Sequence, residues 1–450
     1  MDKKIFREYD IRGVVSEDLT PGVVENLGKA FAKKLIDKTS GNKVVVGRDC
    51  RLSSNDLAQS LFKGLTSSGV DVIDIGICPT PVLYFSQKNF DTNGAIMITG
   101  SHNPPEFNGF KMIVGESTLH GKTIQELYEI IINNDFHVGE GTVEKKQIIP
   151  IYQSYIKENI GIKGHGMKVV IDSGNGTGGV VAHPIMDDLG FDVVSIFEEM
   201  DGNFPNHHPD PTVPDNLKAL ITKVKQSRAK VGIGYDGDAD RIGVVDSDGN
   251  VIYGDKLFII FARDVLTRIP NATFISEVKC SQTMYDAIAK AGGKPIMWKT
   301  GHSLIKQKMK DEKAALAGEM SGHMFFSEGY LGFDDAIYAS CRLLKILVQT
   351  GKTVQELLED IPKTFVTPEI RVACPDEEKF EVVTKVKEYF KKEYKLIDID
   401  GARILFDEGW GLVRASNTQP VLVMRFEAFS EEGLNAIKTK VEEVVNGFIG

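Results

Sequence analysis

The chain has 450 residues, a formal net charge of −10, and an ordinary composition of 42% hydrophobic and 26% charged residues. A nucleic-acid binder needs lysine and arginine to neutralise phosphates, so this charge argues against such partners, although a local basic cluster could still hold a small anion. No apolar run approaches the roughly 20 residues that span a bilayer, and the chain begins without an apolar signal segment. We therefore expect a cytoplasmic protein of two to four domains, with no membrane partner.

The cysteines give the same indication about the compartment. There are five of them, an odd number, and no two form a CxxC pair. This usage is typical of reduced thiols in the cytoplasm and argues against a zinc site.

Strand and helix signals alternate through the first 150 residues. Thr20 and Pro21 are typical of a helix start, and apolar residues then recur at helical spacing from Val24 to Leu35. Short apolar runs that predict strands follow at residues 44–46, 70–75 and 95–98. This alternation predicts a layered α/β domain.

Three stretches further suggest related α/β units, because each is an apolar strand that runs into a polar loop with an aspartate: "VVVGRDCR" (44–51), "VVIDSGNG" (169–176) and "VGIGYDGD" (231–238).

The tail of the chain differs. Two alternating runs within residues 402–428 lie around a Ser-Asn-Thr-Gln-Pro turn, which predicts an antiparallel hairpin, and a helix follows. We expect three similar α/β domains with mixed sheets (1–149, 150–250 and 251–365) and a smaller C-terminal α+β domain (366–450) around a central cleft.

The stretch "ITGSHNPPEFNGFKM" (98–112) places a serine next to a histidine, directly after a buried strand. Pro104 and Pro105 disfavour helix in the preceding residues, so Ser101 should lie in a loop. Such loops, at the carboxyl ends of inner strands, carry the chemistry of open α/β sheets. The residues alone are equally compatible with a polar turn that satisfies its own backbone.

The stretch "DGDADR" (236–241) places three carboxylates at alternate positions between two apolar strands. Like charges this close resist ionising together unless a cation lies among them. The spacing imitates a calcium loop, but Arg241 stands where that loop needs glycine and Ser247 where it needs glutamate. The cluster therefore favours Mg²⁺, with a solvated acidic turn as the other interpretation.

Four further loops carry polar groups. "RASNTQP" (414–420) combines a guanidinium, hydroxyls and backbone N–H groups that can hold a phosphate. "EVKCS" (277–281), "KTGHS" (299–303) and "GEMSGH" (318–323) offer carboxylate, hydroxyl, ammonium and imidazole groups that can bind sugar hydroxyls. Each loop taken alone is also compatible with an ordinary turn.

Taken in order, these motifs resemble the α-D-phosphohexomutase family over essentially the full length, and most closely its bacterial phosphomannomutase/phosphoglucomutase members. The resemblance implies that Ser101 carries a phosphoryl group, that His102 flanks it, and that Lys111 is a candidate for proton transfer. It also implies one Mg²⁺ per chain, held by Ser101, Asp236, Asp238 and Asp240 with Arg241 beside them.

The resemblance assigns the remaining pocket residues as well. "FREYDIRG" (6–13) places Tyr9 and Arg12 in the active site. Glu319 and Ser321 would contact sugar hydroxyls, and His323 would lie near the reacting oxygen. The other implied substrate-binding residues are Lys279, His302, Arg414, Ser416, Asn417 and Thr418. Gln419 departs from the family pattern, which has threonine at this position.

The implied function is interconversion of the 1- and 6-phosphates of mannose or glucose through a phosphoserine and a hexose 1,6-bisphosphate, which would also serve as activator. The partner would be a small sugar phosphate, and the chain a monomer or dimer. Met320 favours glucose and mannose over glucosamine, whose enzymes usually have glutamine there. The alternatives are a phosphoglucosamine mutase, a Mg-dependent sugar phosphatase with an aspartate nucleophile, and a non-catalytic sugar-phosphate sensor. The phosphatase is less favoured because "DGDAD" lacks the D-x-D-x-[TV] ending.

Overall fold

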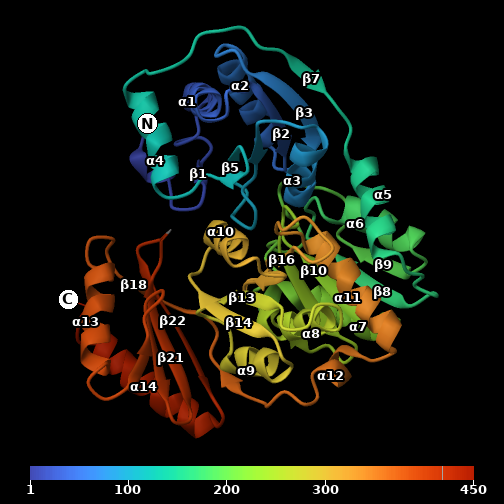
Figure 1. Ribbon diagram of the computed structural model, residues 1–450, viewed down its shortest axis with the longest axis vertical. Helices are drawn as coiled ribbons and strands as arrows, with labels where there is room; N and C mark the ends of the chain where they lie inside the picture. Colours follow the sequence, from blue (N-terminus) through green and yellow to red (C-terminus); the bar gives the residue numbers. More distant parts are fainter. Residues whose placement is uncertain (418, 450) are drawn as a thin grey trace. The chain divides into compact units, whose positions relative to one another are not determined.

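The computed structural model describes residues 1–417 and 419–449 (Figure 1). It divides into two compact units, Met1–Val265 with Ser321–Leu358 (unit 1) and Leu266–Met320 with Glu359–Gly450 (unit 2). All five cysteines lie among the described residues, and none of them forms a disulfide. Within the described ranges, no helix is both long enough and apolar enough to cross a membrane.

The first sheet of unit 1 is mixed, in the order β1-β5-β4-β2-β3-β7 with β6 beside β5. Its strands are β1 (Ile11–Val14), β2 (Lys43–Arg48), β3 (Asp71–Ile77), β4 (Gly94–Ile98), β5 (Phe107–Val114), β6 (Ser117–Thr118) and β7 (Val143–Lys145). The helices of this segment are η1 (Lys3–Ile5), α1 (Pro21–Thr39), α2 (Ser54–Thr66), α3 (Thr80–Asn89) and α4 (Lys122–Ile132). The predicted start of α1 is confirmed, with Thr20 at the N-cap and Pro21 as the first helical residue.

The second sheet of unit 1 has the order β12-β11-β10-β8-β9 and is also mixed. Its strands are β8 (Lys168–Asp172), β9 (Asp192–Ile196), β10 (Val231–Tyr235), β11 (Ile242–Asp246) and β12 (Val251–Ile252). The other elements from residue 149 onward in this unit are α5 (Ile149–Ile160), α6 (Gly179–Asp188), η2 (Pro214–Leu217), α7 (Lys218–Ser227), α8 (Gly254–Leu266), β16 (Met324–Phe326), α11 (Ala336–Thr350) and α12 (Val354–Leu357). Because β8 and β10 are parallel neighbours, "VVIDSGNG" and "VGIGYDGD" belong to the same sheet.

Unit 2 combines a parallel sheet with an antiparallel one. In the first, β13 (Thr273–Glu277) lies parallel to β14 (Lys294–Trp298) and β15 (Leu316–Gly318), with α9 (Gln282–Lys290) and α10 (His302–Glu312) between them in the chain. The second has the order β17-β22-β21-β20-β19, with β18 also pairing with β22. Its elements are β17 (Phe365–Val366), β18 (Ile370–Ala373), α13 (Lys379–Phe390), β19 (Lys395–Ile397), β20 (Ala402–Phe406), β21 (Gly409–Ala415), β22 (Val421–Ala428) and α14 (Glu431–Asn446). The predicted hairpin is β21–β22, but the first predicted run turns at residues 407–408 and forms two strands.

Within unit 2, a buried cluster joins the two sheets. The ring of Trp410, on β21, packs against Val278 at the end of β13. The Arg403 guanidinium lies 3.8 Å from the Trp410 ring centre and donates to the Val278 carbonyl at 2.5 Å. Arg425, on β22, donates to the Lys279 carbonyl. These contacts attach the backbone around Lys279 to the C-terminal antiparallel sheet.

Candidate active site

The loop that carries Ser101 begins where the fully buried strand β4 ends. The chain returns antiparallel in β5, so Lys111 stands opposite Met97 in the register. Ser101 itself is buried, and its φ of 48° lies in the left-handed region that few non-glycine residues adopt. The structure thus places Ser101 in a loop at the carboxyl end of an inner strand, where the sequence predicts it.

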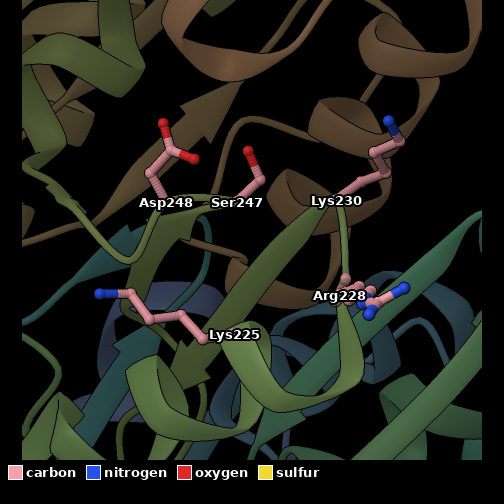
Figure 2. Close-up of a pocket in the computed structure, with 6 residues that line it drawn as sticks. Lys225, Arg228, Lys230, Ser247 and Asp248 are labelled. Atoms are coloured by element: carbon pink, nitrogen blue, oxygen red, sulfur yellow. The ribbon is translucent and has the colours of Figure 1, made fainter.

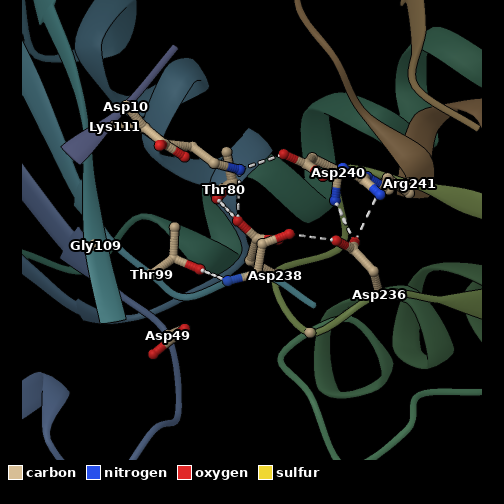
Figure 3. A network of polar contacts seen from close by, with 12 residues as sticks. Asp10, Asp49, Thr80, Thr99, Gly109, Lys111, Asp236, Asp238, Asp240 and Arg241 are labelled. Atoms are coloured by element: carbon tan, nitrogen blue, oxygen red, sulfur yellow. Dashed lines mark hydrogen bonds and ion pairs between the residues drawn. The ribbon is translucent and has the colours of Figure 1, made fainter. Parts of the chain in front are cut away.

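The Ser101 hydroxyl lies next to the aspartate loop, which joins β10 to β11. Its Oγ donates to Oδ2 of Asp236 at 2.8 Å, although the two residues are 135 positions apart. Asp236, Asp238 and Asp240 are buried, and one oxygen of each lies within 4.8 Å of the others (Figure 3). The fold therefore brings the predicted hydroxyl and the predicted carboxylates into one cluster.

A lysine and a threonine enter this cluster from the first sheet segment. Nζ of Lys111 donates to Oδ2 of Asp238 at 2.8 Å and also to Asp240, and Oγ1 of Thr80 donates to Asp238 at 2.5 Å (Figure 3). Burial alone would lower the pKa of Lys111, but Asp238 and Asp240 outweigh it, so this pKa lies well above its ordinary value. The lysine is thus held protonated, which suits a charge partner or a proton donor better than a base.

The carboxylates still exceed the cations that face them. Burial, and then the charges of Asp240 and Asp238, raise the pKa of Asp236 well above its ordinary value. Oδ1 of Asp238 is buried and has no hydrogen-bond partner among the described residues. A divalent cation would pair with that oxygen and stabilise the ionised form of Asp236, so the three aspartates fit a metal ion that takes oxygen ligands.

Two histidines flank the cluster within unit 1. Nδ1 of His102 lies 3.1 Å from Oγ of Ser101, and burial, followed by Arg241 and Arg12, lowers the pKa of His102. Nε2 of His323 lies 3.1 Å from Oδ1 of Asp240 and 3.3 Å from Nε of Arg241. Both imidazoles therefore stand next to groups that would take part in phosphoryl transfer.

The other predicted residues of unit 1 lie near these groups. Arg12, on β1, donates to Oδ1 of Asn103 at 2.8 Å and to Asp10 at 2.6 Å, which ties it to the Ser101 loop. Tyr9 is half-buried two residues before β1. Ser321 Oγ lies 3.2 Å from Nδ1 of His323.

In unit 2, the predicted sugar-binding residues gather at the carboxyl ends of parallel strands. Glu319 follows β15, is buried, and accepts from the Gly301 amide at 2.8 Å. His302 is the first residue of α10. Lys279 follows β13 and pairs with Glu369 at 3.3 Å. The structure thus places the Glu319 carboxylate against the backbone amide that directly precedes α10.

The predicted phosphate loop connects β21 to β22. Arg414 is buried, and its Nε donates to Oδ2 of Asp400 at 3.1 Å. Ser416 accepts from the Gln419 amide at 3.2 Å, which shapes the turn. Asn417 is the next residue of that turn, and Thr418 lies outside the described residues. A guanidinium and a hydroxyl are therefore both present at this turn.

Sequence reasoning missed several residues that support the site. Arg51 and Asp49 hold the Ser101 loop, Thr80 contacts Asp238, and Asp400 orients Arg414. A signal existed for the first pair, since "GRDCR" follows β2 just as the Ser101 loop follows its parallel neighbour β4. Polar residues at the carboxyl ends of adjacent parallel strands meet at one edge of the sheet.

A separate hollow of about 380 Å³ in unit 1 is lined by Lys225, Arg228, Ala229, Lys230, Ser247 and Asp248. Figure 2 shows the Lys225 ammonium and the Arg228 guanidinium pointing in opposite directions. These cations do not converge on one point, so this hollow does not resemble a phosphate site.

Comparison with known proteins gives matches along the chain. Four family models described as phosphoglucomutase/phosphomannomutase match it: alpha/beta/alpha domain I at residues 3–138, domain II at 150–249, domain III at 253–365 and the C-terminal domain at 369–444. A Pseudomonas aeruginosa protein named phosphomannomutase/phosphoglucomutase is 47% identical over 436 residues, covering 97% of this chain and 94% of the relative. A Neisseria gonorrhoeae phosphoglucomutase is 43% identical over 448 residues, covering 98% and 97%. A crystal structure of a phosphoglucomutase/phosphomannomutase family protein from Burkholderia thailandensis has a TM-score of 0.92 at 40% identity, covering 99% of this chain and 98% of that one.

Proposed function

Because this chain belongs to the phosphoglucomutase/phosphomannomutase family, we propose that it moves phosphoryl groups on glucose and mannose by way of Ser101. It is a phosphohexomutase, which interconverts hexose 1-phosphates and 6-phosphates. The observation that carries the proposed role of Ser101 is its hydroxyl, buried in a strand-end loop 2.8 Å from the first of three clustered aspartates. We also propose that the enzyme acts in the cytoplasm, where phosphorylated hexoses are metabolised.

Phosphorylated Ser101 would transfer its phosphoryl group to the free hydroxyl of a hexose monophosphate. The bond between phosphorus and the serine oxygen breaks, a bond to the sugar oxygen forms, and the hydroxyl proton leaves to a neighbouring base, for which His323 is the candidate. The product of this half-reaction is a hexose 1,6-bisphosphate. The bisphosphate then reorients, and its other phosphoryl group is transferred to Ser101. The sugar is left with its phosphate at the other position.

The residues around Ser101 neutralise charge during this transfer. Lys111, held protonated by its carboxylate neighbours, supplies a fixed positive charge, and Arg12, bonded to Asn103 of the Ser101 loop, supplies a second one. His102, whose pKa is lowered by burial, offers a neutral imidazole beside Ser101. A bound Mg²⁺ would be held by Asp236, Asp238, Asp240 and a phosphate oxygen on Ser101, and it would supply Lewis-acid stabilisation of the transferred group.

Unit 2 would bind the rest of the substrate. We propose that Glu319 accepts hydrogen bonds from sugar hydroxyls and that Lys279 and His302 also bind the substrate. For Ser321, in unit 1, we propose a contact with a sugar hydroxyl. The non-reacting phosphate would be held by Arg414, Ser416, Asn417 and Thr418. A buried guanidinium that Asp400 already orients supports this assignment, because a fixed fork suits bidentate phosphate binding.

A coupled assay tests the proposal. With Mg²⁺ and a trace of glucose 1,6-bisphosphate, we expect conversion of mannose 1-phosphate and glucose 1-phosphate, little conversion of glucosamine 1-phosphate, and no release of free phosphate. Ser101→Ala should lose at least about 1,000-fold in turnover. The matched control is Ser60→Ala, on the exposed side of α2, which should retain full turnover. Full turnover by Ser101→Ala, or phosphate release without isomerisation, would contradict the proposed role of Ser101.

A further inference from the structure

The loop that carries Ser101 is held by one guanidinium, and we propose that Arg51 is a positioning residue for phosphoryl transfer. The inference rests on the proposed function of Ser101. The Arg51 side chain is fully buried, with an exposed fraction of 0%. It donates to four backbone carbonyls of this loop: those of Ser101 (2.8 Å), Asn103 (2.6 Å), Pro104 (2.6 Å) and Phe107 (3.0 Å).

The guanidinium is itself immobilised. Oδ2 of Asp49 accepts from Nε of Arg51 at 3.2 Å and from the Gly100 amide at 3.0 Å, so one carboxylate ties the arginine to the start of the loop. Oδ1 of Asp49 accepts from Oγ of Ser54, at the start of α2. The ring of Phe204 lies 5.1 Å from the guanidinium carbon. Arg51 is thus a fixed template and not a mobile surface cation.

The conformation of Ser101 explains what the template does. A φ of 48° costs a non-glycine residue about 1 kcal/mol or more, so the surrounding contacts must hold it. The Ser101 carbonyl is confined on two sides, by Arg51 and by Gly237, where an added Cβ would stand 2.5 Å from that oxygen. An added Cβ on Gly100 would stand 2.4 Å from Nε of Arg51. The backbone on both sides of Ser101 is therefore confined to one conformation, and this conformation sets the direction of the serine side chain.

In-line transfer depends on that direction, because a misplacement of about 1 Å can cost on the order of 100-fold in rate. A lysine at position 51 would keep the charge but could not bridge four carbonyls. Since the side-chain hydrogen bonds of Arg51 go to Asp49 and to the backbone of the Ser101 loop, its loss should affect turnover and not substrate affinity. A loosened phosphoserine should also transfer to water more often relative to transfer to sugar.

The test compares Arg51→Lys with Arg342→Lys. Arg342 is also buried in unit 1, but its guanidinium pairs with Asp264 at 2.8 Å and Glu328 at 2.9 Å. We would measure kcat and KM for glucose 1-phosphate, the melting temperature, and the release of phosphate from the phosphorylated enzyme without sugar. Arg51→Lys should lose about 100-fold in kcat with KM within threefold, and phosphate release should increase relative to transfer. Arg342→Lys should keep kcat within threefold even if its melting temperature falls.

A second variant covers the case in which Arg51→Lys does not fold. Phe204→Leu removes only the ring beside the guanidinium, and it should lower kcat several-fold with KM unchanged. The proposal is overturned if the folded Arg51→Lys enzyme keeps kcat within threefold, if the loss lies in KM, or if Phe204→Leu leaves kcat unchanged. Ser101→Ala separates the two hypotheses: its full activity refutes the phosphoserine, whereas an inactive Ser101→Ala beside a normal Arg51→Lys refutes only the positioning role.

Discussion

Replacing Lys111 by methionine should make the stability of unit 1 depend on Mg²⁺. The lysine side chain has an exposed fraction of 5%, and its Nζ lies 2.8 Å from Asp238 and also contacts Asp240. Removing one partner of a buried ion pair costs about 3–5 kcal/mol, because the other charge stays buried and unpaired. Methionine has a similar length, so most of the effect should come from charge and little from packing.

The size of the shift follows from the size of the unit. For large domains, 1 kcal/mol changes the melting temperature by about 2 °C, so the transition of unit 1 in EDTA should fall by roughly 6–10 °C. Millimolar Mg²⁺ should restore more of this loss in the variant than it adds to the wild type, because the ion and the ammonium neutralise the same carboxylates. Differential scanning calorimetry with and without the ion measures both effects.

The matched control is Lys218→Met. Nζ of Lys218 also lies 2.8 Å from a carboxylate, that of Asp215, but its side chain has an exposed fraction of 74%. An exposed pair contributes about 0–1 kcal/mol, so this variant should melt within about 2 °C of the wild type. If Lys111→Met melts as the control does in EDTA, or if Mg²⁺ raises both enzymes equally, the charge balance we describe is wrong.

Three further outcomes can be measured. Asp238→Asn should weaken Mg²⁺ binding by about 100-fold in isothermal titration, whereas Asp248→Asn, in the separate hollow, should leave it unchanged. The Lys279 ammonium lowers the pKa of Glu369 to about 2, so this carboxylate stabilises unit 2 above pH 4.5 and the contribution is lost as pH falls from 4.5 toward 2. Glu369→Gln should therefore flatten that part of the melting profile, by about 1–2 kcal/mol after allowing for the partial exposure of the carboxylate. Arg403→Met should lower the free energy of unfolding of unit 2 by about 2–4 kcal/mol, because the buried Val278 carbonyl loses its hydrogen-bond donor. An unchanged melting temperature of unit 2 would contradict this.

Local signals in the sequence were sufficient for several buried elements. Buried strands such as β4 and amphipathic helices such as α1 are visible as apolar runs or as helical spacing, because burial selects the residue type directly. The turn at residues 407–408 was missed although Asp407-Glu408-Gly409 interrupts the apolar run and is a local turn signal. The pairing of β8 with β10 cannot be seen in the sequence, since register between distant strands leaves no local mark.

In the site, too, residues with a local signal were predicted, and residues that act through long-range contacts were not. The aspartate cluster was predicted from three carboxylates between two apolar strands, whereas Ser101 was assigned from the resemblance to the family, since its loop alone is equally compatible with a polar turn. Arg51 was missed although its loop follows β2, the parallel neighbour of β4, because its contacts go to backbone carbonyls, which every residue has. The pairing of Lys111 with Asp238, across 127 positions, likewise depends on the fold.

The buried contacts of Arg403 and Trp410 determine which residues must be exchanged together when a chimera is made between relatives. A chimera that swaps only residues 366–450 would pair a foreign residue 403 with the native Val278 carbonyl and a foreign residue 410 with the native Val278 side chain. A chimera that exchanges residues 266–320 along with 359–450 keeps each guanidinium with its own backbone. Protein engineers who recombine these enzymes should therefore cut the gene at the three borders of the compact unit, after residues 265, 320 and 358, and transfer both pieces at once.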